Sequence, residues 1–327
     1  MSNKSINRIA VLTSGGDAPG MNAAIRSVVR ASAHFGKHVY GIYRGYDGMI
    51  KGTIKRIERN EVGNIIHRGG TILKTARSYE FFTPEGRQRA YDTLKAHDID
   101  ACVVIGGNGT YTAAMIFAQE FDIPMMGIPG TIDNDIYGTD FTIGFDTALN
   151  TAIDAVDKIR DTADSHNRVF FIEVMGRHTG HLALHTGIGS GATGILIPEN
   201  NVSIDSLVSQ LRKGVKRGKL FSLVIVAEGN KTGGAAKIAE EVAEQLPELE
   251  SKVTIIGHLQ RGGAPSCHDR VLASRLGSSA VKAILDGNYN KAVGIINDEI
   301  VYTEFSDAIS MDKSPKKSLI EMTQILS

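Results

Sequence analysis

The chain has 327 residues, of which 42% are hydrophobic, so it can bury a large core and is long enough for two domains. Its 36 basic residues balance 36 acidic residues, which argues against a general nucleic-acid or membrane-surface protein. No apolar run reaches the roughly 20 residues of a membrane helix, and residues 1–8 are polar, without a signal-peptide core. Two cysteines, Cys102 and Cys267, are too few for a disulfide framework, so we expect a cytoplasmic protein.

The first part of the chain alternates apolar runs with turns and amphipathic stretches. Residues 8–13 predict a buried strand, Ser14–Gly20 a turn, and residues 21–35 a helix with apolar residues at helical spacing. The next predicted elements are a strand at 38–43, a helix at 85–96, a strand at 101–105, a helix from the turn at 106–110 to about 121, and a strand at 123–128. Residues 44–84 are less regular.

The second part continues the same alternation. In order, we predict a helix at 146–160, strands at 169–174 and 195–197, a helix at 204–215, a strand at 223–227, a helix at 236–246, a strand at 253–256 and a helix at 270–285. Asp312–Lys317 is expected at the surface. Repeated strand, glycine-rich turn and helix predict two Rossmann-like three-layer α/β/α domains with mostly parallel sheets. We place the larger domain at 1–144 plus 260–310 and the smaller at 145–259 plus 311–327.

Two acids follow the strand at 123–128, in the turn Pro129-Gly-Thr-Ile-Asp-Asn-Asp135. Open α/β sheets bind their ligands at the carboxyl ends of parallel strands. One acid could take a proton from a hydroxyl group while the other faces a cation. The alternative is an Asx-turn and helix cap, which Asp and Asn favour by themselves.

Three glycine-rich turns each follow a predicted strand: Ser14-Gly-Gly-Asp17, Gly106-Gly-Asn-Gly-Thr110 and Pro129-Gly-Thr131. Glycine lets backbone N–H groups approach phosphate oxygens, and the N-terminus of the following helix favours negative charge. One such turn is usually plain turn chemistry. Three at converging strand ends indicate a polyphosphate site, although none has the Walker pattern.

Arginines and an acid lie at further strand ends and glycine-rich turns. Arginine forks bind phosphate bidentately, whereas any single arginine is more often a solvated surface residue. Glu228 could accept hydrogen bonds from a sugar hydroxyl. The basic residues concerned are Arg77, Arg168, Arg177, His258 and Arg261. No His, Cys or Asp cluster has transition-metal spacing, so only a hard cation such as Mg²⁺ fits. Together these residues predict phosphoryl transfer from a nucleotide to a hydroxyl group.

Four stretches carry a resemblance to a known family. They are Leu12–Arg26, Pro129–Asp135, Glu173–Arg177 and Gly257–Gly263. They resemble bacterial ATP-dependent 6-phosphofructokinases, in order, from about residue 8 to 310. The resemblance implies a homotetramer whose active site is shared between subunits. It also implies transfer from MgATP to fructose 6-phosphate, giving fructose 1,6-bisphosphate, with a phosphorylated effector bound between subunits.

The resemblance also implies roles for individual residues. Asp133 would be the base on the sugar 1-hydroxyl with Thr131 beside it, and Asp135 and position 108 would face Mg²⁺. The ATP residues would be Gly16, Arg77, Ser78, Gly107, Asn108, Gly109 and Thr110. The sugar-phosphate residues would be Thr131, Asp133, Met175, Gly176, Arg177, Glu228, His258 and Arg261, with Arg168 and Lys252 from a neighbouring subunit. The effector residues would be Arg26, Arg30, Arg59, Arg160, Arg217 and Lys219.

Departures from the family's pattern define the alternatives. Asn108 stands where Asp is usual, which removes one negative charge at the metal. Lys252 replaces an arginine fork, and Thr193 stands where the effector site usually has a metal-binding Glu. These departures allow a catalytically weak phosphosugar-binding subunit. The other alternative is a pyrophosphate-dependent enzyme, whose members usually carry Asp and Lys where this chain has Gly109 and Gly130. We expect side chains at both glycines to crowd the α-phosphate, which favours ATP.

Overall fold

The chain folds into two units that alternate along the sequence. The computed structural model describes residues 6–163, 168–200, 202–218 and 221–326. The first unit comprises Met1–Asp146 and Arg261–Lys313, and the second comprises Thr147–Gln260 and Ser314–Ser327. The resemblance implies that the larger domain binds ATP and that the smaller domain binds fructose 6-phosphate, and this assignment stays a prediction.

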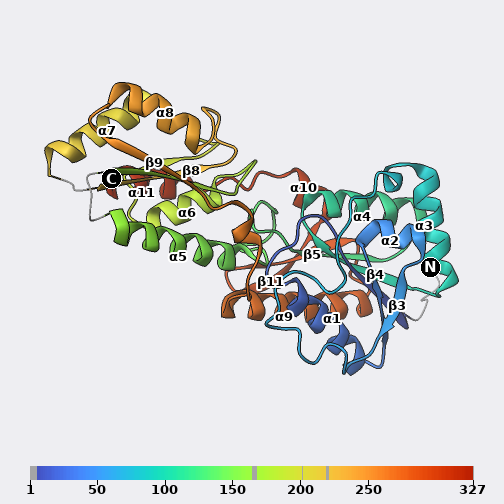
Figure 1. The fold of residues 1–327 in the computed structure, drawn as a ribbon. Helices are drawn as coiled ribbons and strands as arrows, with labels where there is room; N and C mark the ends of the chain where they lie inside the picture. The colour runs from blue at the N-terminus through green and yellow to red at the C-terminus, as the bar shows by residue number, and fades with distance from the viewer. Residues whose placement is uncertain (1–5, 164–167, 201, 219–220, 327) are drawn as a thin grey trace. The chain divides into compact units, whose positions relative to one another are not determined.

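A seven-stranded sheet forms the centre of the first unit (Figure 1). Its strands are β1 (Arg8–Thr13), β2 (His38–Ile42), β3 (Ile54–Ile57), β4 (Ala101–Gly106), β5 (Met125–Pro129), β10 (Lys291–Ile296) and β11 (Glu299–Glu304). They lie in the order β11-β10-β5-β4-β1-β2-β3. Both edge strands, β3 and β11, are antiparallel to their neighbours and the other pairs are parallel. The mostly parallel α/β class is therefore confirmed.

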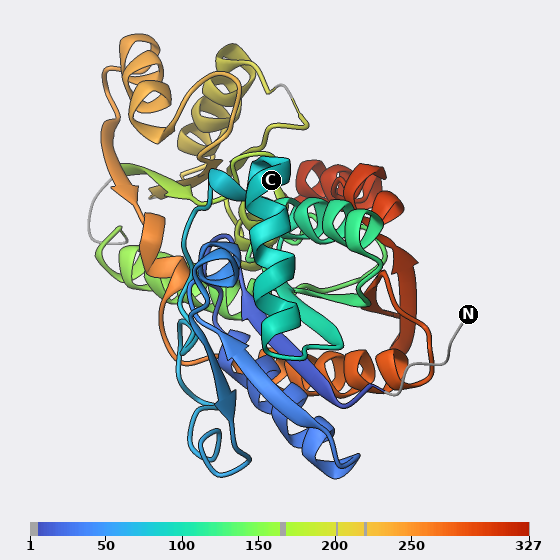
Figure 2. The same cartoon turned by 90° about the vertical axis from the view of Figure 1, so that its right-hand side faces the viewer.

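Helices cover both faces of this sheet. Figures 1 and 2 show α1 (Met21–His34) and α9 (Cys267–Leu285) on one face. The other face carries α2 (Gly45–Lys51), α3 (Pro84–Ala96), α4 (Asn108–Phe121) and α10 (Phe305–Ser310). Every residue of β4 is buried because the strand is covered on both faces, which explains its continuous apolar sequence.

The second unit has its own sheet and core. Four parallel strands lie in the order β7-β8-β6-β9, with bounds β6 (Arg168–Val174), β7 (Gly194–Leu196), β8 (Phe221–Ala227) and β9 (Glu250–Ile255). The helices are α5 (Phe145–Ala163), α6 (His181–Gly189), α7 (Ile204–Lys216), α8 (Ala235–Gln245) and α11 (Lys317–Leu326). Phe171, Leu207 and Ile238 are central in a core between the sheet and helices α7 and α8.

Several elements were not predicted, and each has a local reason. α6 contains two glycines, which lower helix propensity. The hairpin of β10 and β11 turns at Asn297 and Asp298, both with positive φ, rather than at a glycine. The surface prediction for Asp312–Lys317 was wrong at Pro315, which is buried, and at Lys313, which is half-buried. The sequence pattern also did not predict four short elements, α2, β3, α10 and α11.

The described part of the chain contains no helix with the length and apolar character that crossing a membrane requires.

Candidate active site

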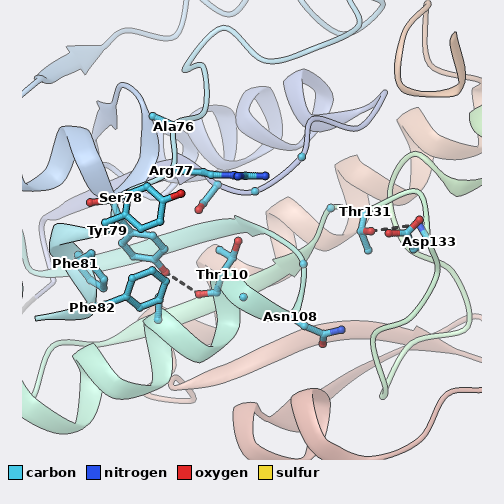
Figure 3. A pocket seen from close by; sticks show the side chains of 18 of the residues that line it. Ala76, Arg77, Ser78, Tyr79, Phe81, Phe82, Asn108, Thr110, Thr131 and Asp133 are labelled. Atoms are coloured by element: carbon cyan, nitrogen blue, oxygen red, sulfur yellow. Dashed lines mark hydrogen bonds between the residues drawn. The ribbon is translucent and has the colours of Figure 1, made fainter. Parts of the chain in front are cut away.

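Turns at the carboxyl ends of β1, β4 and β5 meet at a cavity of about 530 Å³ in the first unit (Figure 3). These strands are neighbours in the parallel sheet, so their ends lie at one edge, as expected for a ligand site. All of the predicted ATP residues line this cavity, namely Gly16, Arg77, Ser78, Gly107, Asn108, Gly109 and Thr110. Thr131, Asp133, Asp135 and Arg261 line it as well.

The turn after β4 leads directly into helix α4. Gly107 is the N-cap residue, and Asn108 is the first residue of the helix. A Cβ atom at Gly106 would lie 2.3 Å from Thr110 Oγ1 and 2.5 Å from the Ser14 carbonyl oxygen, so this position requires glycine. The free N–H groups of the first helical turn and the helix dipole both favour an anion at the cavity.

Asn108 and Asp135 are in direct contact across the cavity. Asn108 Nδ2 donates a hydrogen bond of 3.0 Å to Asp135 Oδ2. Asn108 Oδ1 is buried and accepts no hydrogen bond from any residue that the structure describes. A buried carbonyl oxygen without a donor is costly. Beside a carboxylate, it makes an oxygen-only set that suits a hard cation.

No preformed cage for a cation surrounds these two oxygens. Within the described ranges, no three His, Cys, Asp or Glu side chains are grouped closely enough to hold a metal. Mg²⁺ normally binds through one or two protein oxygens and takes its remaining ligands from water and phosphate. Asn108 and Asp135 therefore fit Mg²⁺ delivered with a nucleotide.

The acidic turn, Pro129–Asp135, is held by its own polar groups. Asp133 N donates to Thr131 Oγ1 at 3.2 Å, which Figure 3 shows as a dashed line. Thr142 Oγ1 donates to the Thr131 carbonyl at 2.6 Å. Asn134 has a φ of 52°, in the left-handed region that Asn tolerates better than most residues. Asn134 lies between Asp133 and Asp135 in the sequence, so its backbone angles set the relative directions of the two acids.

Lys313 lies against the acidic turn, and sequence reasoning missed it. Its ammonium group donates to Asn134 Oδ1 at 2.8 Å. Burial lowers the pKa of Lys313 to about 8, although Asp135 and Asp140 raise it. No local pattern could have indicated this contact, because 179 residues separate its partners.

An aromatic wall, comprising Tyr46, Tyr79, Phe81 and Phe82, also lines the cavity. Figure 3 shows Tyr79, Phe81 and Phe82 at the end away from Thr131 and Asp133. Tyr79 and Phe82 are 73% and 77% exposed, which is unusual for side chains of this size. The ring centroids of Tyr46 and Phe81 are 4.3 Å apart. A planar aromatic ligand could stack here. The aromatic run directly after Arg77 was a signal that sequence reasoning did not use.

The buried arginine Arg87 fastens this wall to α4. Its NH1 donates to the Phe82 carbonyl at 2.9 Å, and its NH2 and Nε donate to Glu120 at 2.7 and 2.5 Å. The hydrogen bonds to Glu120 raise the pKa of Arg87. Arg87 therefore holds both the aromatic wall and helix α4.

Arg261 belongs to the first unit, unlike most of the predicted sugar-phosphate residues. Its NH1 donates to the Asp17 carbonyl at 3.3 Å. Its guanidinium also lies against Gly16, where a Cβ atom would be 2.4 Å from NH1. It therefore lies at the same cavity as the predicted ATP residues.

The second unit brings the ends of β6 and β8 together. Glu228 N donates to the Val174 carbonyl at 2.9 Å, and Gly229 N donates to the Gly176 carbonyl at 3.2 Å. A Cβ atom at Gly229 would lie 1.9 Å from the Arg177 carbonyl oxygen, so only glycine fits. Of the other predicted sugar-phosphate residues, Met175 and His258 lie after β6 and β9 in this unit.

Arg168 and Lys252 share one carboxylate. Glu250 accepts from Arg168 Nε at 2.6 Å, and its other oxygen lies 2.6 Å from Lys252 Nζ. Hydrogen bonds from Lys252 and Arg168 lower the pKa of Glu250 to about 2. The parallel register of β6 and β9 pairs Arg168 with Glu250, which explains their meeting. The two cations predicted to act in a neighbouring subunit therefore lie together.

The predicted effector residues are divided between the units. Arg26 and Arg30 lie one helical turn apart on α1, and the buried Nε of each has no hydrogen-bond partner in the described structure. Burial and the charge of Arg30 lower the pKa of Arg26. Arg59 follows β3 in the first unit, and Arg160 donates to the Ser190 carbonyl in the second. Arg217 is the C-cap of α7, and Lys219 lies outside the described residues.

Gly109 and Gly130 both line the cavity, and the expectation that side chains at these positions would crowd the α-phosphate stays a prediction. A Cβ atom at Gly130 would meet Ile105 Cγ2 at 3.0 Å and Met21 Cε at 3.1 Å, so it would press on apolar side chains. A Cβ atom at Gly109 would have nothing within 4 Å, and Gly109 lines the cavity. The open space at Gly109 therefore supports the expectation of a nucleotide donor.

The chain matches one family model and is similar to curated proteins over nearly its whole length. The family model described as phosphofructokinase matches residues 8–284. The chain is 58% identical over 319 residues to ATP-dependent 6-phosphofructokinase 2 of Bacteroides thetaiotaomicron, covering 98% of each chain. It is 51% identical to ATP-dependent 6-phosphofructokinase 1 of Thermus thermophilus, covering 98% of this chain and 100% of that one.

A solved structure agrees with the sequence comparisons. The phosphofructokinase of Saccharomyces cerevisiae superposes with a TM-score of 0.88 at 38% identity. The match covers 98% of this chain and 47% of the yeast chain, so this chain spans about half of that longer protein.

Proposed function

The chain belongs to the phosphofructokinase family, and from this membership we propose that it is an ATP-dependent 6-phosphofructokinase with Asp133 as general base. It transfers the terminal phosphoryl group of ATP to the 1-hydroxyl of fructose 6-phosphate. The observation that carries the proposal is the cavity in which the glycine turns, Arg77 and the acidic turn meet. The relatives that share about half of this sequence or more bear the same name.

The cavity has an aromatic end that suits a nucleotide base and a helix N-terminus that suits its phosphates. The base stacks against the aromatic wall, and the polyphosphate extends to the N-terminus of α4, whose N–H groups receive it. In Figure 3, Arg77 extends toward the side on which Thr131 and Asp133 lie. A guanidinium there stabilises charge on the phosphoryl group as it transfers.

Asp133 removes the proton from the sugar hydroxyl as that oxygen bonds to phosphorus. The bond from phosphorus to the bridging oxygen of ATP breaks, and ADP leaves with that electron pair. The Thr131 hydroxyl oxygen accepts a hydrogen bond from the Asp133 backbone N–H and so fixes the backbone of the base. A fixed backbone keeps the Asp133 carboxylate directed at the 1-hydroxyl of the sugar. Much of the rate comes from this positioning. The residues proposed to bind the phosphate end of the sugar are Met175, Gly176, Arg177, Glu228 and His258.

Asn108 and Asp135 are the residues that would hold Mg²⁺. The buried Asn108 oxygen and the adjacent carboxylate support this role. When bound, the cation neutralises charge on the phosphate oxygens. The hydrogen bond from Asn108 orients the Asp135 carboxylate. Because the family usually has Asp at position 108, the metal site of this chain carries one negative charge fewer.

Asn108→Asp is expected to raise the affinity for Mg²⁺ about tenfold, or ~1.4 kcal/mol, because it adds a carboxylate beside Asp135. Without Mg²⁺ the same change lowers Tm, because two like charges replace a hydrogen bond. Titration calorimetry with Mg²⁺ and a non-hydrolysable ATP analogue, and thermal unfolding with and without Mg²⁺, measure both effects. Asn108→Ala is the uncharged control. Unchanged affinity in the Asp variant would exclude position 108 from the metal site.

Initial rates with ATP and with pyrophosphate, each titrated with Mg²⁺, test the proposed donor. We expect turnover with ATP, because Gly109 leaves the cavity open. Activity with pyrophosphate alone would establish the pyrophosphate-dependent alternative. Binding of fructose 6-phosphate without turnover at saturating Mg²⁺ would establish the phosphosugar-binding alternative, which Asn108 and Lys252 motivate.

The homotetramer and the effector belong to the same proposal. β9 is an edge strand, and near it Val253, Ile255 and Leu259 are 41%, 60% and 70% exposed. An apolar edge of this kind suits a second copy of the chain, which would bring Arg168 and Lys252 to the neighbour's sugar phosphate. Among the described residues, the buried Nε atoms of Arg26 and Arg30 have no hydrogen-bond partner, which supports a phosphorylated effector. A cytoplasmic setting stays a prediction from the two free cysteines.

A further inference from the structure

Lys313 has no role in the mechanism above, yet its ammonium group lies inside the first unit. It follows α10 and is the last residue of that unit. Its Nζ donates to Asn134 Oδ1 at 2.8 Å and lies 3.4 Å from the Asp140 carbonyl oxygen. An ammonium group leaves water only where such partners compensate it. The contact is therefore a specific feature of the acidic turn.

Asn134 is the residue through which this contact reaches the two acids. Its side chain is buried, and it lies between Asp133 and Asp135. Besides Lys313, its Oδ1 accepts from Thr142 N at 3.0 Å, while its Nδ2 donates to the Asp140 carbonyl at 3.2 Å. Both ends of the amide are thus fixed, and Lys313 brings to it a partner from a distant part of the chain.

The backbone of Asn134 sets the relation between the acids on either side. Its φ of 52° lies in the left-handed region, which Asn tolerates better than most L residues, and its hydrogen bonds to Thr142, Asp140 and Lys313 hold it there. Relaxation toward the common regions would rotate Asp133 relative to Asp135. Because phosphoryl transfer depends on positioning, a small rotation has a large effect on rate.

We propose that Lys313 is a positioning residue for phosphoryl transfer: through Asn134, its ammonium group holds the acidic turn in the conformation that directs Asp133 and Asp135. The inference rests on the proposed function, in which those acids are the base and the metal-facing carboxylate. It predicts that loss of Lys313 impairs the transferring step more than it impairs binding of either substrate.

Lys313→Met removes the ammonium group and keeps most of the apolar stem. We expect kcat to fall about 10-fold to 100-fold, while KM for ATP and for fructose 6-phosphate each change less than about threefold. Lys313→Arg keeps a charged donor and restores part of the loss. Lys316→Met, which removes an exposed lysine nearby, is the matched control and keeps the parent's kcat. A merely structural role would lower Tm and leave kcat unchanged at temperatures where the variant is folded.

A double-mutant cycle tests whether Lys313 acts through Asn134. Asn134→Gly tolerates positive φ but has no side-chain acceptor. In that background, Lys313→Met is expected to cause less than about a threefold further loss of kcat, since the shared contact is already absent. If Lys313→Met does not fold, Lys313→Gln, which keeps an N–H donor without the charge, takes its place in the cycle with the same expected division between kcat and KM.

Three results would overturn the inference: a kcat of Lys313→Met within threefold of the parent, equal losses in kcat and in substrate binding, or an undiminished loss in the Asn134→Gly background. Failure of the proposed function would look different. In that case the parent would not turn over ATP and fructose 6-phosphate, or Asp133→Asn would remain fully active. An active parent with an inactive Asp133→Asn and an unaffected Lys313→Met would reject the role of Lys313 alone.

Discussion

Asp133→Asn is expected to lower kcat about 100-fold to 10,000-fold, the usual contribution of a general base. The amide has nearly the same shape as the carboxylate but cannot accept the proton of the sugar hydroxyl. The Asp133 backbone N–H donates to Thr131 Oγ1, and this contact of the turn remains after the substitution. KM for fructose 6-phosphate should therefore change little. Steady-state kinetics with each substrate varied in turn measure the two effects separately.

Asp135→Asn is the matched control on the same turn. It removes a carboxylate that is proposed to face Mg²⁺, so its loss of activity should shrink as Mg²⁺ is raised. The loss in Asp133→Asn should persist at every Mg²⁺ concentration. The role of Asp133 as base would be contradicted if its variant lost as much in sugar affinity as in kcat, or if saturating Mg²⁺ restored it.

Arg77→Ala is expected to lower kcat about 100-fold to 1,000-fold, comparable to the removal of one preorganised donor from a transition state. Arg77 is an exposed arginine that lines the nucleotide cavity. Its fork can meet two oxygens of the transferring group as charge develops there. Arg77→Lys keeps the charge without the fork, and its kcat should lie between those of the parent and the alanine variant.

The control for Arg77 is Arg56→Ala. Arg56 is an exposed arginine on β3 that pairs with Glu58 and does not line the cavity. Its variant should keep the kcat and both KM values of the parent. If Arg77→Ala raised KM for ATP and left kcat unchanged, Arg77 would contribute equally to the ground state and the transition state. That result would remove it from the transferring step.

Local patterns predicted the parts of this protein in which neighbours along the chain decide the structure. Leu12–Gly16 and Ile105–Thr110 each pair an apolar run with glycines. In the structure, the end of a strand is followed by a turn in the first and by the start of helix α4 in the second. The predicted ATP residues come from these turns and from Arg77 and Ser78, and they do meet at one cavity. Parallel strands bring their carboxyl ends to one edge of the sheet, so the order of strands and turns along the chain was sufficient to predict where the site lies.

Contacts between distant residues were beyond any local pattern. The hydrogen bond between Asn108 and Asp135 joins residues of two turns, and its geometry depends on side-chain rotamers. The direction of a Cβ atom at Gly130 depends on backbone angles, which a one-letter motif does not specify. The aromatic wall requires Arg87 and Glu120 to meet across 33 residues.

The sequence by itself determined the α/β class, the strand-end turns and the residue types from which a phosphoryl-transfer site can be built, because each follows from short-range periodicity and backbone preference. Tertiary structure alone decided which of these residues touch: Asn108 with Asp135, Arg261 with the Gly16 turn, and Lys313 with Asn134. Such contacts depend on how the strands are ordered and how the loops pack. Their energy arises only after chain segments up to 244 residues apart have been brought together.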